Sequence, residues 1–154
     1  MINRRLVRET VLQSIYAYKQ SGDAVQHIAD SIIKETLSSE KEARRFAEKL
    51  FFRTLEHETE FNELVTSQIQ NWDINRLAMI DLIVLKMALC EFIYFEEIPT
   101  KVTINEAIEI VKKYSTAKSG RFVNGILDAS LLELNKNGKI KKTGRGLIER
   151  STDK

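Results

Sequence analysis

Residues 77–95 constrain the fold of this chain more than any other stretch, because they are apolar around nearly the whole circumference of a helix. Only Asp81, Lys86 and Glu91 interrupt the run with charge. The length of the run would suit a membrane span, but three charges spread around the helix argue against one. A helix that is apolar on nearly every side is typical of the centre of a bundle. We therefore predict an all-α fold, a compact helical bundle built around this segment.

The residues before this segment carry apolar stripes with helical spacing. The first stripe starts after Asn3, a candidate helix cap, and runs to about residue 20. Further stripes cover residues 23–37 and 43–69, and the second of them thins near residues 57–60, where we expect a bend or a break. The N-terminal half of the chain is thus predicted to be helical.

Two more helices are expected after Pro99, which ends the apolar run. Thr103 and Glu106 have the spacing of a capping box and predict the start of the first of these helices. The last helix follows the stripe that begins at Phe122 and contains Gly125. Because glycine costs a helix interior up to about 1 kcal/mol relative to alanine, Gly125 predicts close packing of another element there.

Positive charge is concentrated at the ends of the chain. The net charge is +2, but residues 136–154 alone contribute +5 (seven basic residues against two acidic ones), which leaves −3 for residues 1–135. The C-terminal residues also lack helical periodicity. We predict one domain over residues 1–135 and a basic, flexible tail over 136–154. Localised positive charge favours an anionic partner that is touched at particular places.

The inventory of catalytic and metal-binding residues is nearly empty. The single cysteine, Cys90, cannot form an internal disulfide, and it falls mid-way along the most apolar helix. The stretch "HETEF" begins like a metalloprotease helix, but Phe61 stands where a second histidine ligand is needed. We therefore expect no enzyme activity, no metal and no cofactor. The lone cysteine and the lack of an apolar leader predict a cytoplasmic protein without a signal peptide.

Arg4, Arg5 and Arg8 fall at the start of the first predicted helix, where the helix dipole opposes positive charge. One interpretation is a solvated face on which the arginines pair with nearby acids. The other is a phosphate-binding patch that positions the protein on nucleic acid. Only the second interpretation explains why three cations stand at the unfavourable end of a helix, so we favour it.

A second basic segment, "STAKSGRFVNGILD", starts the last predicted helix. Lys118 and Arg121 flank Phe122 here. An aromatic ring between cations can stack on an unpaired base while the cations hold its phosphates. Spacing alone favours a core position for Phe122, because Ile126 follows one helical turn later.

Several ordered stretches resemble the NusB family of bacterial transcription antitermination factors. "NRRLVRETVLQSIYAY" looks like the arginine-rich first helix of that family, and "NWDINRLAMIDLIVLKMALCEF" looks like its central helix. "KVTINEAIEIVKKYS" and "GRFVNGILD" are similar to its two most recognisable segments. The resemblance covers about residues 3–135, and it implies a fold of two packed helical subdomains.

The resemblance also implies a function and its partners. It implies binding of boxA RNA, a short single-stranded element of ribosomal RNA leader transcripts, with NusE, a small-subunit ribosomal protein, in the antitermination complex on RNA polymerase. It implies RNA contacts for six residues: Arg4, Arg5, Arg8, Lys118, Arg121 and Phe122. It implies NusE contacts for Tyr16, Arg76 and Asp81. Members of the family occur as monomers or as homodimers.

Two other function classes stay open at this stage. A similar helical RNA-binding domain precedes the methyltransferase domain in a family of ribosomal RNA cytosine methylases, so the chain could be a module of that kind. It could also be a helical protein-interaction adaptor without an RNA role, which would lack salt-dependent affinity for RNA.

Overall fold

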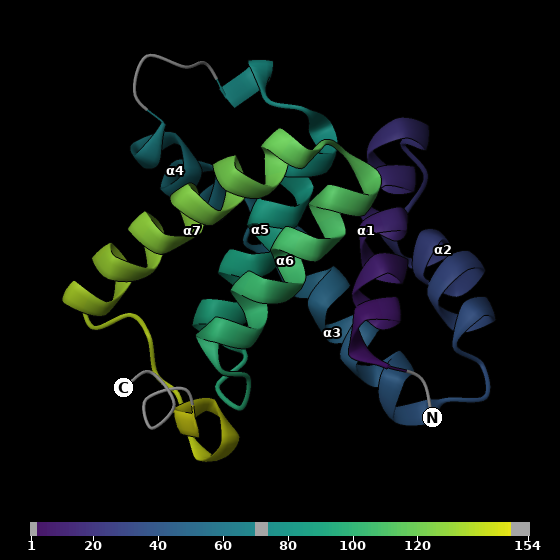
Figure 1. Ribbon diagram of the computed structural model, residues 1–154. Helices are drawn as coiled ribbons and strands as arrows, with labels where there is room; N and C mark the ends of the chain where they lie inside the picture. The colour runs from purple at the N-terminus through teal and green to yellow at the C-terminus, as the bar shows by residue number, and fades with distance from the viewer. Residues whose placement is uncertain (1–2, 70–73, 149–154) are drawn as a thin grey trace. The chain divides into compact units, whose positions relative to one another are not determined.

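The computed structural model describes residues 3–69 and 74–148. Within those ranges every regular element is a helix or a single helical turn, which confirms the all-α prediction (Figure 1). The chain forms two compact units that divide between His57 and Glu58. This division agrees with the two helical subdomains that the family resemblance implies, and each unit is described by itself below.

The first unit contains four helical elements, α1 (Arg4–Ser21), α2 (Val25–Ile28), the π-helical η1 (Ala29–Lys34) and α3 (Lys41–Glu56). Helix α1 packs against α3 and against η1, and α3 also packs against η1. The buried side chains of α1 repeat with helical spacing at Val7, Val11 and Ile15, none of which is exposed. The apolar stripe predicted for the first helix is therefore the face that forms the core of this unit.

The ends of these helices follow local signals in the sequence. Asn3 caps α1, because its side-chain oxygen accepts a hydrogen bond from the Leu6 N–H at 2.9 Å. Helix α3 ends at Glu56 and the next helix starts at Glu58, so the predicted break near residues 57–60 is confirmed.

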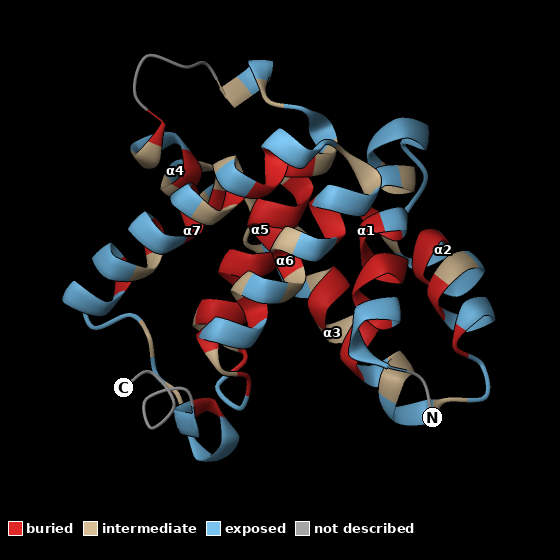
Figure 2. Ribbon diagram, viewed as in Figure 1, coloured by how far each residue is buried: buried red, intermediate tan, exposed pale blue. Residues whose placement is uncertain are grey.

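The second unit contains α4 (Glu58–Gln68), the short turn η2 (Ile74–Arg76), α5 (Met79–Tyr94), α6 (Thr100–Tyr114), α7 (Ala117–Lys136) and the short turn η3 (Gly144–Leu147). Helix α5 packs against α4, α6 and α7. All of its residues from Ile83 to Phe92 are buried (Figure 2). None of the helices in the described part of the chain combines the length and hydrophobicity that crossing a bilayer requires. Helix α5 is the centre of a helical unit, as its sequence predicts.

Two predictions from local sequence patterns are wrong. Helix α6 begins at Thr100, so Thr103 lies inside it and caps nothing; its hydroxyl instead donates to the buried carboxylate of Glu91 at 2.8 Å. Gly125 does not mark a close approach, because a Cβ built there would meet no atom of another described element within 4 Å. The pattern within one helix shows neither the Glu91 partner of Thr103, which lies on another helix, nor the open space beside Gly125.

The described part of the basic tail contacts the end of α5. The Lys142 ammonium donates to the carbonyl oxygens of Phe95 at 2.7 Å and Glu91 at 3.0 Å, which lie at the C-terminus of α5 where a cation is favoured. A Cβ at Gly146 would overlap the carbonyl oxygen of Glu96. Residues 142–146 therefore lie against the C-terminal end of α5 within the second unit, and residues 149–154 of the tail lie outside the described part. The division into a domain and a flexible tail stays a prediction.

Candidate nucleic-acid interface

The first candidate element is the basic start of α1, in the first unit. The Asn3 cap places Arg4 in the first turn, and that turn contains no acidic residue. Arg4 and Arg5 are exposed, whereas Arg8 is only 4% exposed. The two exposed arginines are therefore accessible to an anion, whereas the Arg8 side chain is buried.

Phe46 of α3 connects two of these arginines. The Arg4 guanidinium lies 4.0 Å from the centroid of the Phe46 ring, and the Arg8 guanidinium lies 5.5 Å from it. A cation over an aromatic face gains about 0.5–1 kcal/mol at an exposed site and about 2 when desolvated. The ring therefore offsets part of the dipole penalty and orients the cations. Sequence reasoning missed this role, because Phe46 fits the apolar stripe of its own helix.

The second candidate element is the start of α7, in the second unit. Thr116 caps this helix, with its side-chain oxygen accepting from the Ser119 N–H at 3.2 Å. Lys118 and Arg121 are exposed, and Phe122 is partly buried. The Phe122 ring is therefore neither fully buried nor fully exposed, so one part of it is available for stacking with another aromatic group.

A pocket of about 210 Å³ opens beside Phe122. One wall comes from η2 and the start of α5, and the other from the start of α7; the lining residues include Arg76, Leu77, Asp81, Lys118, Ser119 and Phe122. The family resemblance implies that Arg76 and Asp81 contact a protein and that Lys118 and Phe122 contact RNA. The structure brings these four residues to one pocket.

Asp81 and Ser119 join the two walls of the pocket. The Ser119 hydroxyl donates to Asp81 Oδ2 at 2.7 Å, across 38 positions of the sequence. Asp81 is 7% exposed, and its other oxygen, Oδ1, is buried and has no hydrogen-bond partner among the described residues. Tyr16, the third residue predicted to contact a protein, lies in the first unit and is 41% exposed.

Comparison with known proteins assigns the family. The sequence matches the NusB family over residues 5–131. It is 43% identical over 152 residues to the transcription antitermination protein NusB of Salinibacter ruber, covering 99% of this chain and 95% of the relative. The structure matches T. maritima NusB with a TM-score of 0.79 and 34% identity, covering 86% of this chain and 92% of the other. The chain belongs to the NusB family.

A further NusB structure supports the fold alone. It comes from a crystal structure of the antitermination factors NusB and NusE in complex with double-stranded RNA. The TM-score is 0.77 at 24% identity, and the match covers 84% of this chain and 96% of the other.

Arg5, Arg8 and the residues from Lys118 to Phe122 fall inside the range that matches the NusB family, whereas Arg4 and the C-terminal tail fall outside it.

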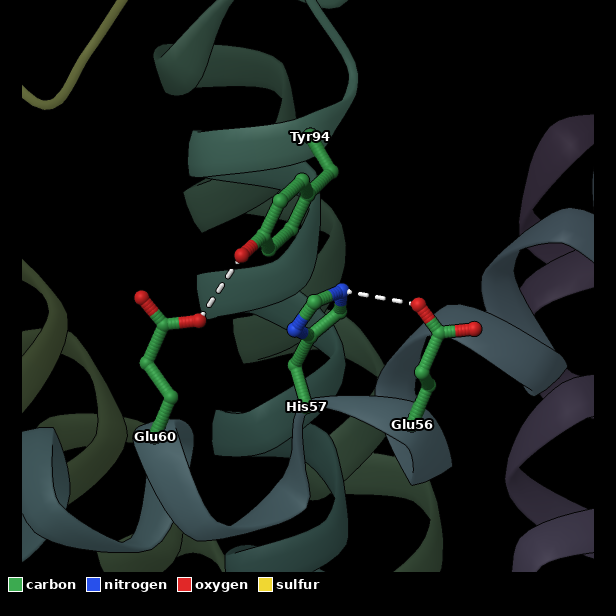
Figure 3. Close-up of polar contacts among 4 residues, drawn as sticks. All are labelled: Glu56, His57, Glu60 and Tyr94. Atoms are coloured by element: carbon green, nitrogen blue, oxygen red, sulfur yellow. Dashed lines mark hydrogen bonds and ion pairs between the residues drawn. The ribbon is translucent and has the colours of Figure 1, made fainter.

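Figure 3 shows two polar contacts of residues in and beside the stretch "HETEF". His57 Nε2 lies 3.1 Å from Glu56 Oε1. In the second unit, the Tyr94 hydroxyl donates to Glu60 Oε1 at 2.8 Å. Among the residues that the structure describes, no cluster of histidine, cysteine, aspartate or glutamate could hold a metal ion. Cys90 is buried, as its place in α5 predicts.

Proposed function

We propose that this NusB-family chain is a transcription antitermination factor that binds single-stranded boxA RNA together with NusE. The proposal includes its membership of the antitermination complex on RNA polymerase. The name of its Salinibacter ruber relative and the family assignment support this role. The proposed activity is binding, and it requires no catalytic group.

The observation that carries the proposal is the pocket beside Phe122, where an aromatic ring lies with Arg76 and Lys118 in one concave surface. An unpaired base can stack on such a ring, at about 1–3 kcal/mol per base. Lys118 and Arg121, both exposed cations of α7, can hold the neighbouring phosphates. This arrangement favours a single-stranded partner, because the bases of a duplex are already stacked.

The arginines of α1 supply a second contact with the RNA backbone in this proposal. Arg4 and Arg5 offer exposed guanidinium groups, and the cation–π contact with the Phe46 ring orients Arg4. Arg8 shares the same ring from its buried position and supports the arrangement. These contacts carry no base information, so they raise affinity without setting the sequence preference.

The proposed NusE contacts differ in how they can act. Tyr16 and Arg76 are exposed, so a protein partner can reach both side chains directly. Asp81 is buried. A direct contact between NusE and Asp81 therefore requires the pocket to be part of the interface with the protein.

Fluorescence anisotropy tests the proposal, with a labelled boxA RNA and a scrambled control, each titrated with and without NusE. We expect preferential binding of boxA that tightens with NusE. Each phosphate contact that is lost lowers the dependence of log affinity on log salt by about 0.7 for a single strand. Arg5→Glu and Lys118→Asp should each weaken binding and lower this slope.

Lys34 supplies matched controls, because it is exposed and lies outside both candidate elements. Lys34→Glu and Lys34→Asp change the net charge by the same amount as the two test variants and should leave boxA affinity nearly unchanged. Equal weak binding of both RNAs, unaffected by NusE, would refute the proposal. NusE binding without salt-dependent RNA affinity would point instead to a protein-interaction adaptor.

A further inference from the structure

Asp81 lies where the N-termini of two helices come together. It belongs to the first turn of α5, and its carboxylate accepts a hydrogen bond from Ser119 in the first turn of α7. Both side chains are more than nine-tenths buried, at 7% and 6% exposure. A negative charge is favoured at the start of a helix, and the first turn of α7 has no acidic residue of its own. Asp81 supplies that charge from another helix.

The hydrogen bonds at this point have one consistent direction. A carboxylate can only accept, so the Ser119 proton is committed to Asp81. The oxygen of Ser119 lies 3.0 Å from the Ser115 hydroxyl and 3.1 Å from the Thr116 hydroxyl, and it can accept from them. The chain of hydrogen bonds therefore runs from the turn before α7, through Ser119, to Asp81.

This chain of hydrogen bonds holds the segment that carries the proposed RNA contacts. Lys118 precedes Ser119 directly, and Arg121 and Phe122 follow within the next turn. Lys118 and Arg121 are cations at the unfavourable end of a helix, and the Asp81 carboxylate counters that cost. A segment that is always in its RNA-binding conformation binds RNA more tightly than one that adopts this conformation in only a fraction of the molecules.

We propose that Asp81 is a positioning residue for RNA binding, acting through Ser119 to set the start of α7, and that it does not need to touch a partner. This inference rests on the proposed function, since it assumes that Lys118, Arg121 and Phe122 contact RNA. It assigns to Asp81 a role different from the NusE contact that the family resemblance implies.

The test uses the full-length chain and labelled boxA RNA in the absence of NusE. Ser119→Ala and Asp81→Ala should each lower RNA affinity about three- to tenfold, as expected if the competent arrangement falls to between a third and a tenth of the molecules. Both changes break the same hydrogen bond, the one from Ser119 to Asp81. The double variant should therefore bind RNA no more weakly than whichever single variant binds it less tightly. Asp81→Asn keeps an oxygen that can accept from Ser119 and should recover part of the affinity.

Ser130 provides the matched control. It is a buried serine of the same helix, and its hydroxyl has no hydrogen-bond partner among the described residues. Ser130→Ala should leave RNA affinity unchanged. A second control places Ser119→Ala in a Lys118→Ala/Arg121→Ala/Phe122→Ala background, where all three proposed RNA contacts are gone and it should have little further effect on affinity. A merely structural role of Ser119 would not depend on that background.

The outcomes separate this inference from the proposed function. If Phe122→Ala and Lys118→Asp leave RNA affinity unchanged, the proposed RNA site is wrong and the inference falls with it. If they weaken binding while Ser119→Ala and Asp81→Ala do not, only the positioning role is wrong. Additive losses in the double variant would also overturn it. So would a loss with Asp81→Ala that appears only when NusE is present, because it would indicate a direct protein contact.

Discussion

The buried ion pair between Lys86 and Glu58 makes an asymmetric prediction about stability. Lys86 Nζ in α5 lies 2.5 Å from Glu58 Oε2 in the first turn of α4. The lysine side chain is 4% exposed and the glutamate side chain 25% exposed. Removing the glutamate takes an ion-pair partner away from a charge in the protein interior, whereas removing the lysine leaves a charge that water reaches. The two single variants should therefore differ in their free energies of unfolding.

The magnitudes follow from this difference in exposure. Breaking a buried pair on one side costs about 3–5 kcal/mol, and the partial exposure of Glu58 lowers the expected cost of Glu58→Ala to about 2–4 kcal/mol. This figure includes about 0.3–1 kcal/mol for losing an acid at a helix N-terminus. Lys86→Met keeps most of the buried volume and should cost about 0–1 kcal/mol.

Urea denaturation followed by circular dichroism measures the change in free energy of unfolding for both variants, and thermal unfolding measures the change in Tm. For a chain of this length a loss of 1 kcal/mol lowers the Tm by about 2–4 °C, so Glu58→Ala should lower it by about 4–16 °C and Lys86→Met by at most about 4 °C. Glu63→Ala, at an exposed position of the same helix, is the control and should change stability by less than about 0.5 kcal/mol. A larger loss for Lys86→Met than for Glu58→Ala would refute the reasoning.

Three further substitutions test other features of the structure. Gly125→Ala should stabilise the protein by about 0.5–1 kcal/mol, because a helical glycine is replaced where no neighbour stands within 4 Å; unchanged or lower stability in a urea titration would contradict this. Gly146→Ala should displace the tail from α5, because its Cβ overlaps the Glu96 carbonyl oxygen; the expected sign is faster proteolysis within residues 139–148, and an unchanged cleavage rate would count against it. Phe46→Leu removes the ring beneath Arg4 and should lower boxA affinity about two- to fivefold, in line with a cation–π contact of about 0.5–1 kcal/mol, and equal affinity in an anisotropy titration would argue that the ring plays no part.

Local patterns in the sequence determine the helices of this protein. The all-round hydrophobicity of residues 77–95 predicts a central helix, and the structure buries α5 among α4, α6 and α7. The cap at Asn3 and the break after Glu56 are likewise set by residues within a turn or two of the helix ends. Such features depend on contacts between near neighbours in the chain, and these can be read from spacing.

The candidate site depends on contacts that spacing does not encode. The sequence predicts the basic and aromatic residues of α1 and α7, but neither the Phe46 ring beneath Arg4 nor the bond from Ser119 to Asp81 has a local signal. Gly125 shows the converse, since a glycine that suggests close packing has no neighbour within 4 Å. A helical period tells which face of a helix is buried, but not which side chain of another helix lies against it. The sequence alone therefore determined which elements form and which residues can carry charge to a ligand. Only the tertiary structure decided which of those residues share a pocket and which are held in place by a partner far along the chain.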